Sequence, residues 1–164
     1  MPDAPYVRTL IAGWAACDVN GHMRNSAYLD MASDVRMLWF AEHDFPPAHF
    51  ARLGLGPVVK SDLLEYFREV RLLQPVRVEL RLAGMSDDGS RMRLRNDFVR
   101  DDGVLAARLT SHVGWLDLAA RKLCAAPEAL LRVMQAMPRD DDFEMLRSSV
   151  RREGAITSPR GSSV

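Results

Sequence analysis

Hydrophobic residues recur along this chain with two different spacings, one typical of a helix and one typical of strands. From Ser26 to about His43 they recur every three or four positions, which predicts a helix. The polar residues that fall outside this apolar spacing are Asp30, Ser33, Asp34 and Arg36. The apolar face is wider than one stripe, so we expect this helix to be buried on several sides. The segment 6–14 is rich in β-forming residues and predicts a first strand, and 15–25 predicts a turn.

The second spacing dominates the middle of the chain. Over 76–83 apolar residues alternate with charged ones, which is the pattern of a half-buried strand. The strands expected in this part cover 57–70, 76–83, 92–98 and 104–118. Asp87-Asp88-Gly89 and Asp101-Asp102-Gly103 predict hairpin turns, because glycine accepts the positive φ that such turns require. Hairpins between successive strands imply an antiparallel sheet, so we expect an α+β fold with one long helix against one curved antiparallel sheet.

Prolines and polar composition divide the remaining sequence. Pro46-Pro47 ends the long helix, and we expect a loop at 44–56. A short helix is expected at 127–137, starting with a proline. The chain then becomes polar, so we expect a single domain at 1–138 and a mobile tail at 139–164.

Composition narrows the classes of function. The chain has 164 residues with 22 basic and 22 acidic side chains, and this balance gives no bulk attraction to nucleic acid or to an acidic membrane. It contains no run of about 18 apolar residues, so no membrane span is predicted. The N-terminus lacks the pattern of a signal peptide. Cys17 and Cys124 lie far apart and outside any CxxC pair, which favours a cytoplasmic protein with reduced thiols over a zinc or disulfide framework.

The segment Ala16–Leu29, ACDVNGHMRNSAYL, gathers a carboxylate, an imidazole and an amide just before the long helix. It resembles the D-x-D-x-x-G-H-x-N-N-x-x-Y-L pattern of hotdog-fold thioesterases related to 4-hydroxybenzoyl-CoA thioesterase. The resemblance continues more weakly through 65–72 and covers most of 6–120. It departs from the pattern at Ala16 and Arg24, where the family has aspartate and asparagine.

This resemblance implies a hotdog fold and the hydrolysis of an acyl-CoA or acyl-carrier-protein thioester, with no cofactor and no metal. It also implies a homodimer or a dimer of dimers, because hotdog proteins pair their uncovered sheet edges. Nucleic acid is not expected as a partner.

Within the motif, Asp18 holds the place of the family's second aspartate, which implies that it activates water as a general base or attacks the thioester carbonyl itself. Backbone amides near Gly21–Met23 are implied as donors to the developing oxyanion. His22 and Asn25 are further catalytic candidates, which could bond the thioester oxygen or orient a water. The alternative interpretation is structural, because Asp-x-Asn-Gly forms turns and Asn25 or Ser26 could cap the helix.

A second group of residues is expected to contact the substrate. These residues are Gly21, Met23, Arg24, Tyr28, Ser61 and Glu65. Ser61 and Glu65 lie on a strand that, in related hotdog enzymes, runs past the active site of the neighbouring subunit. For Tyr28 a place in the core or in an interface is the alternative. Some hotdog families carry a catalytic carboxylate on the helix, where this chain has Asp30 and Asp34.

Basic residues and histidines elsewhere have two interpretations. A basic stripe consists of Arg91, Arg93, Arg95 and Arg100, of which the first three would share one face of a strand. They could contact the phosphates of coenzyme A or an acidic carrier protein, or they could form a solvated outer face paired with acidic residues of neighbouring strands. The histidines without metal-ligand spacing are His43, His49 and His112.

Two other functions compete with thioester hydrolysis. A non-catalytic hotdog module that binds acyl thioesters stays open because of the departures at Ala16 and Arg24. A hotdog hydratase or dehydratase would also use an aspartate and a histidine, although in a different local pattern.

Overall fold

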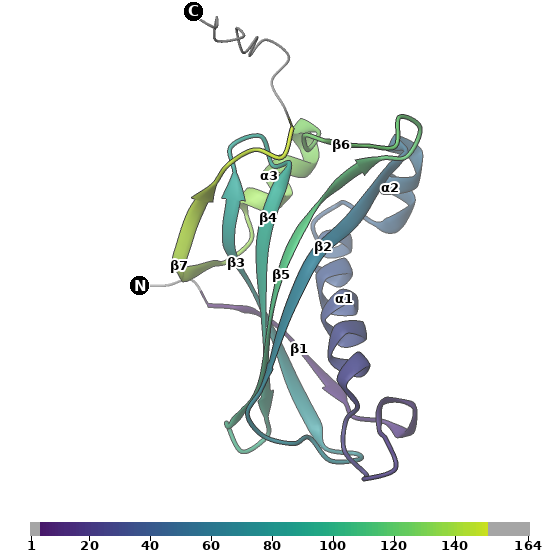
Figure 1. The fold of residues 1–164 in the computed structure, drawn as a ribbon, viewed down its shortest axis with the longest axis vertical. Coiled ribbons are helices and arrows are strands. Elements are labelled where there is room, and N and C mark those ends of the chain that lie inside the picture. The colour runs from purple at the N-terminus through teal and green to yellow at the C-terminus, as the bar shows by residue number, and fades with distance from the viewer. Residues whose placement is uncertain (1–3, 151–164) are drawn as a thin grey trace, which may run out of the picture.

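The structure is a computed structural model and describes residues 4–150. Its elements are β1 (Tyr6–Ile11), η1 (Trp14–Ala16), α1 (Asn25–Glu42), α2 (Pro47–Leu53), β2 (Leu55–Tyr66), β3 (Pro75–Ser86), β4 (Arg91–Arg100), β5 (Leu105–Asp117), β6 (Lys122–Cys124), α3 (Glu128–Gln135) and β7 (Arg139–Leu146). The long helix and the five strands predicted from the sequence are confirmed as α1 and β1 to β5, with ends that shift by a few residues (Figure 1).

All the described strands belong to one sheet. The strand order is β1-β3-β4-β5-β2, and every neighbouring pair in this order is antiparallel. β6 pairs with the end of β5, and β7 pairs with β3 in parallel. The two predicted hairpin turns are present, with φ of 64° at Gly89 and 80° at Gly103. The α+β class and the antiparallel sheet are therefore confirmed.

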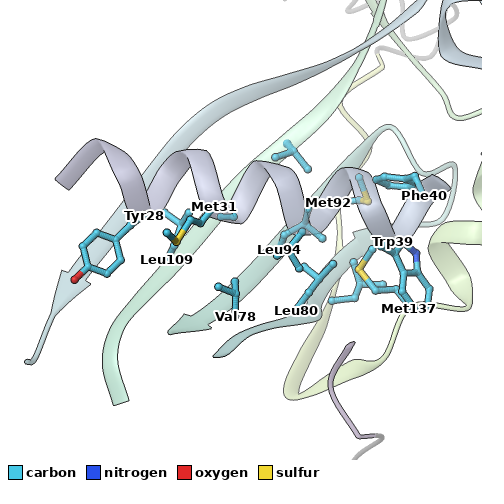
Figure 2. Packing of buried hydrophobic residues seen from close by; sticks show 14 of the residues in the cluster. Tyr28, Met31, Trp39, Phe40, Val78, Leu80, Met92, Leu94, Leu109 and Met137 are labelled. Carbon is cyan, nitrogen blue, oxygen red and sulfur yellow. The ribbon is translucent and has the colours of Figure 1, made fainter. Parts of the chain in front are cut away.

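The hydrophobic core lies between the helices and one face of the sheet. Figure 2 shows the α1 side chains Tyr28, Met31, Trp39 and Phe40 above the sheet residues Val78, Leu80, Met92, Leu94 and Leu109. The long helix does not cover this face alone. Phe50 of α2 packs edge-on against Phe40 at 5.7 Å and stacks on Trp115 at 5.5 Å. Leu130 and Met134 of α3 are fully buried in the same core.

The segment 44–56, expected to be a loop, contains the helix α2. Pro47 lies in the first turn of α2, where a proline removes no helical hydrogen bond. Gly54 follows the helix in the left-handed conformation, with φ of 61°, and ends it. The prediction was wrong over Pro47–Leu53, because the prolines that stop α1 also start α2.

The expected mobile tail begins with a strand. β7 lies along the second half of β3, with Glu144 opposite Gly84. A Cβ at Gly84 would lie 2.9 Å from the Glu144 carbonyl oxygen, so glycine permits this close approach. The predicted boundary at 138 is therefore wrong for Arg139–Leu146. The part of the predicted tail at 151–164 lies outside the described residues.

Two further expectations concern the chain as a whole. Over residues 4–150 no helix is long and apolar enough to cross a membrane. Cys17 and Cys124 are both free.

Candidate active site

The turn before α1 is built on Asp18. Its Oδ1 accepts a hydrogen bond from the backbone N of Asn20 at 2.9 Å, and its carbonyl oxygen accepts one from the N of Gly21 at 3.0 Å. Gly21 has φ of 71°, which glycine adopts without steric cost. The predicted turn is confirmed, and the Asp18 side chain is exposed within the chain.

The connection between β2 and β3 holds this turn in place. The backbone N of Met23 donates to the Val70 carbonyl at 2.7 Å, and the N of Leu72 donates to the Gly21 carbonyl at 2.9 Å. Met23 is buried and Val70 is fully buried, so this hydrogen bond is shielded from water. In Figure 1 both segments lie at the end of the molecule where α1 starts.

From Gly21 to Asn25, at the end of this turn, two backbone amides are free among the described residues. The amides of Gly21 and Met23 already donate to carbonyl oxygens of Asp18 and Val70. The amides of His22 and Asn25 have no acceptor among residues 4–150. Asn25 is the first residue of α1, so the partial positive charge of the helix N-terminus adds to its amide. Of the range Gly21–Met23, only His22 thus keeps a free amide.

The start of α1 is fastened by Arg24. This residue, and not Asn25 or Ser26, is the N-cap, so the predicted cap position is wrong by one or two residues. Asn25 nevertheless accepts a bond from a first-turn amide, because its Oδ1 lies 2.8 Å from the N of Ser26. The Arg24 guanidinium donates to the Ala15 carbonyl at 3.1 Å and to the Ser26 hydroxyl. The family's asparagine is therefore replaced here by a side chain that ties the turn to the helix.

His22 points to a hollow of about 490 Å³ beside the end of β2. Its Nε2 lies 3.8 Å from Oε1 of Glu69. A hydrogen bond from Arg71 and, less strongly, the His22 charge lower the pKa of Glu69. The other residues around the hollow include Met23, Tyr28, Tyr66, Phe67, Arg68 and Arg100.

Tyr28 forms the floor of this hollow from α1. Its ring is buried and packs edge-on against Tyr66 at 5.5 Å and Phe98 at 5.0 Å. Burial, with smaller contributions from the neighbouring Tyr66 and Cys17, raises the pKa of Tyr28 to about 12. The phenol is therefore neutral at physiological pH, and Tyr28 belongs to the core as well as to the rim of the hollow.

Within one chain, Asp18 and His22 line different hollows. Asp18 lies in a second hollow, of about 310 Å³, together with Trp14, Cys17, Val19, Gly21 and Leu72. Trp14 and Val19 are among the most exposed large apolar residues of the chain. The turn thus presents a carboxylate on one side and an imidazole on the other.

Ser61 and Glu65 lie on β2 and share neither of these hollows. Both are exposed, and they sit opposite His112 and Arg108 of β5. β2 pairs only with β5 among the described strands, so its outer edge is uncovered.

Two residues of the predicted arginine stripe, Arg93 and Arg95, form ion pairs with β7, and Arg100 pairs with Asp102. Arg95 contacts Asp140 at 2.5 Å and Asp142 at 2.9 Å, and Arg93 contacts Glu144 at 3.0 Å. Of the two interpretations, the structure favours the outer face paired with acidic residues. In residues 4–150 no group of three or more His, Cys, Asp or Glu side chains could hold a metal ion.

Comparison with known proteins places this turn in a family. Residues 12–134, which contain the turn, α1 and strands β2 to β5, match the thioesterase-like superfamily. The chain belongs to this superfamily. One curated relative is the L-carnitine dehydrogenase/betainyl-CoA thioesterase of Agrobacterium fabrum, 26% identical over 130 residues, or 79% of this chain. The chain spans about a quarter of that relative's length, since the match covers 26% of it.

Solved structures share the fold of this superfamily member. A Staphylococcus aureus protein solved in complex with CoA matches with a TM-score of 0.74 at 20% identity, over 85% of this chain and 90% of that one. The 1,4-dihydroxy-2-naphthoyl-CoA thioesterase of Synechocystis matches with a TM-score of 0.72 at 14% identity, over 80% of this chain and 96% of that one. These neighbours support a hotdog-like fold.

Sequence reasoning missed one residue of the superfamily domain, Arg36. It was grouped with the polar positions of the helix, yet its side chain is buried against the sheet. The signal that could have found it is spacing, because Arg36 lies four residues from both Ala32 and Phe40, which are buried on the same face. Arg36 lines a third hollow, of about 230 Å³, between α1, β2, β4 and β5.

Proposed function

We propose that this chain is a thioesterase that hydrolyses acyl-CoA or acyl-carrier-protein thioesters, with Asp18 as the catalytic carboxylate. One observation carries the proposal. Inside the segment that matches the superfamily, the exposed carboxylate of Asp18 is followed by free amides at His22 and Asn25, where α1 begins. A base, oxyanion donors and a positive helix end are what acyl transfer from a thioester requires.

In the proposed reaction Asp18 takes a proton from water while the water oxygen attacks the thioester carbonyl carbon. The carbonyl oxygen becomes an oxyanion, which the amides of His22 and Asn25 stabilise. Collapse of this intermediate breaks the carbon–sulfur bond, and the departing thiolate takes up the proton. Direct attack by Asp18, followed by hydrolysis of the mixed anhydride, would give the same products.

We place the carrier end of the substrate in the hollow beside His22. Arg68 borders this hollow, and its guanidinium has no acidic partner among residues 4–150. An unpaired guanidinium suits the phosphates of coenzyme A or of a carrier-protein arm. The names of the similar proteins include a betainyl and a dihydroxynaphthoyl group. These two acyl groups differ in charge and shape, so they do not indicate which acyl group this chain would take.

The uncovered edge of β2 supports a homodimer, alone or within a dimer of dimers. Large apolar residues are exposed along it at Val59, Leu63 and Tyr66, followed by Phe67. A long apolar edge strand invites pairing with another strand. Antiparallel pairing of two β2 strands about a two-fold axis would continue the sheet and keep both α1 helices on one face. In this arrangement Ser61 and Glu65 lie at the seam between the subunits.

The test is a thiol-release assay on short, long and aromatic acyl-CoAs with wild type and Asp18→Asn. Asparagine keeps an oxygen that can accept the Asn20 amide, so the turn is preserved while the base is lost. We expect kcat/KM to fall at least about a hundredfold, a usual contribution of a general base. The control is Asp87→Asn. The Oδ1 of Asp87 accepts the Asp88 amide in a distant hairpin, so this variant makes the same change away from the site. It should change kcat/KM less than about twofold.

Two results would contradict the proposal. Unchanged turnover in a folded Asp18→Asn would remove Asp18 from the mechanism. Binding of acyl-CoA without any thiol release by wild type would favour the non-catalytic binding module.

A further inference from the structure

Arg36 is a buried cation held by neutral groups. Only 8% of the residue is exposed, and it reaches from α1 to the sheet. Its Nε donates to Oδ1 of Asn96 at 2.8 Å, and its Nη2 donates to the Ser111 hydroxyl at 2.7 Å. Both partners are fully buried. Burial lowers the pKa of Arg36 to about 10, against the opposing effect of Asp62, so the guanidinium stays charged at neutral pH.

The charge of Arg36 is balanced through Ser111. The Ser111 hydroxyl accepts from Arg36 and donates to Oδ1 of Asp62, so guanidinium, hydroxyl and carboxylate form one chain with no net charge. One nitrogen of the Arg36 guanidinium takes no part in these hydrogen bonds. The Nη1 of Arg36 has no hydrogen-bond acceptor among residues 4–150. It is not one of the fully enclosed atoms without a partner, so part of its surface is open.

Apart from Ser33 and Arg36 itself, the residues around the hollow beside Arg36 are apolar. Its walls include Met37, Phe40, Val58, Met92, Val113 and Trp115. Figure 2 shows two of these residues, Phe40 and Met92, at the end of α1 away from Tyr28. The volume of about 230 Å³ corresponds to about eight water-sized units of roughly 30 Å³. A free guanidinium N–H beside such a surface is costly unless a polar atom reaches it.

We propose that this hollow receives the acyl group of the substrate, and that Nη1 of Arg36 binds a hydroxyl or keto oxygen near the far end of that group. This inference rests on the proposed thioesterase function and names its substrate class, a medium-sized acyl group with one neutral oxygen substituent. A neutral oxygen fits better than a carboxylate, because Asp62 already balances the charge of Arg36 and would repel a second anion.

Symmetry would bring a catalytic turn to this hollow. Val58, in the first half of β2, forms part of its wall. Antiparallel pairing of two β2 strands places this half beside the end of β2 in the second copy, because the strands run in opposite directions. Tyr66, the last residue of β2, and the following Phe67 border the hollow beside His22. The acyl hollow of one copy would thus adjoin the catalytic turn of the other.

The test compares three six-carbon thioesters, hexanoyl-CoA, 5-oxohexanoyl-CoA and adipoyl-CoA, by thiol release from the full chain. We expect kcat/KM for 5-oxohexanoyl-CoA to exceed that for hexanoyl-CoA at least about tenfold, because a site with an unpaired donor discriminates against a substrate that lacks the acceptor. It should exceed that for adipoyl-CoA as well, because Asp62 would repel the terminal carboxylate. Arg36→Met should bring the ratio of 5-oxohexanoyl-CoA to hexanoyl-CoA close to one. The control is Ser33→Ala in the same wall, where the Ser33 hydroxyl donates to the Leu29 carbonyl, and this variant should keep the preference.

Each contrary outcome has a separate meaning. Equal kcat/KM for hexanoyl-CoA and 5-oxohexanoyl-CoA in wild type would overturn this inference and leave the thioesterase standing, whether or not Arg36→Met folds. A preference that survives in a folded Arg36→Met would overturn the role of Arg36. The absence of thiol release from these three esters and from the wider panel would overturn the proposed function and the inference together.

Discussion

A chain that ends at Pro138 should be much less stable than one that ends at Val150. The shorter chain loses β7, which pairs with β3 at four register positions. It also loses the three ion pairs that Arg93 and Arg95 make with β7. At about 1 kcal/mol for each lost hydrogen bond and less for each ion pair, we expect the free energy of unfolding to fall by about 3–5 kcal/mol.

Urea denaturation followed by far-UV circular dichroism measures this difference. Ending both chains at or before Val150 means that they differ only in residues that the structure describes. A loss of several kcal/mol is a large part of the stability of a domain of this size, so the shorter chain should be partly unfolded at low urea. A difference below about 1 kcal/mol would refute the reasoning and show that residues 139–150 behave as the tail predicted from the sequence.

Two further predictions concern the same region. Gly84→Ala should cost about 1–3 kcal/mol in urea denaturation because its Cβ would press on the Glu144 carbonyl, whereas Gly13→Ala, whose Cβ meets nothing nearer than 4.0 Å, should stay within about 0.5 kcal/mol. Burial would raise the pKa of Asp88, but hydrogen bonds from Ser148, Ser90 and Ser86 outweigh it and lower the pKa to about 2. The stabilisation from Asp88 is therefore complete above about pH 4 and is lost as the pH falls from about 4 to 2, so acid denaturation of Asp88→Asn should be less steep in that range.

The elements that the sequence predicted well are those with local determinants. The spacing of apolar residues defined α1, and Gly89 and Gly103 marked their hairpins because the φ values of those turns belong to single residues. The missed elements depend on distant partners. α2 has only seven residues and is held by Phe50 against Phe40 and Trp115. The sequence of β7 alone predicts a polar tail, because its strand depends on ion pairs between its carboxylates and the arginines of β4.

The same distinction explains the candidate site. The motif located the turn, because the side chain and carbonyl of Asp18 and the amide of Gly21 build it locally. The motif could not tell which amides stay free, since the Met23 amide is engaged by Val70, a residue from another part of the chain. Nor could it reveal Arg36, whose burial depends on Asn96 and Ser111 of two different strands.

In our proposal the active site is complete only in the dimer. A single chain presents Asp18 and His22 on opposite sides of a turn and leaves the hollow of Arg36 beside an uncovered strand. In one chain neither the turn nor the hollow forms a complete site. Antiparallel pairing along β2 would place residues of the second copy beside both. Dissociation of the dimer should then abolish turnover before the chain unfolds. Dilution would lower specific activity while the circular dichroism signal per residue stays constant, and activity that is independent of concentration in a demonstrated monomer would separate catalysis from the seam.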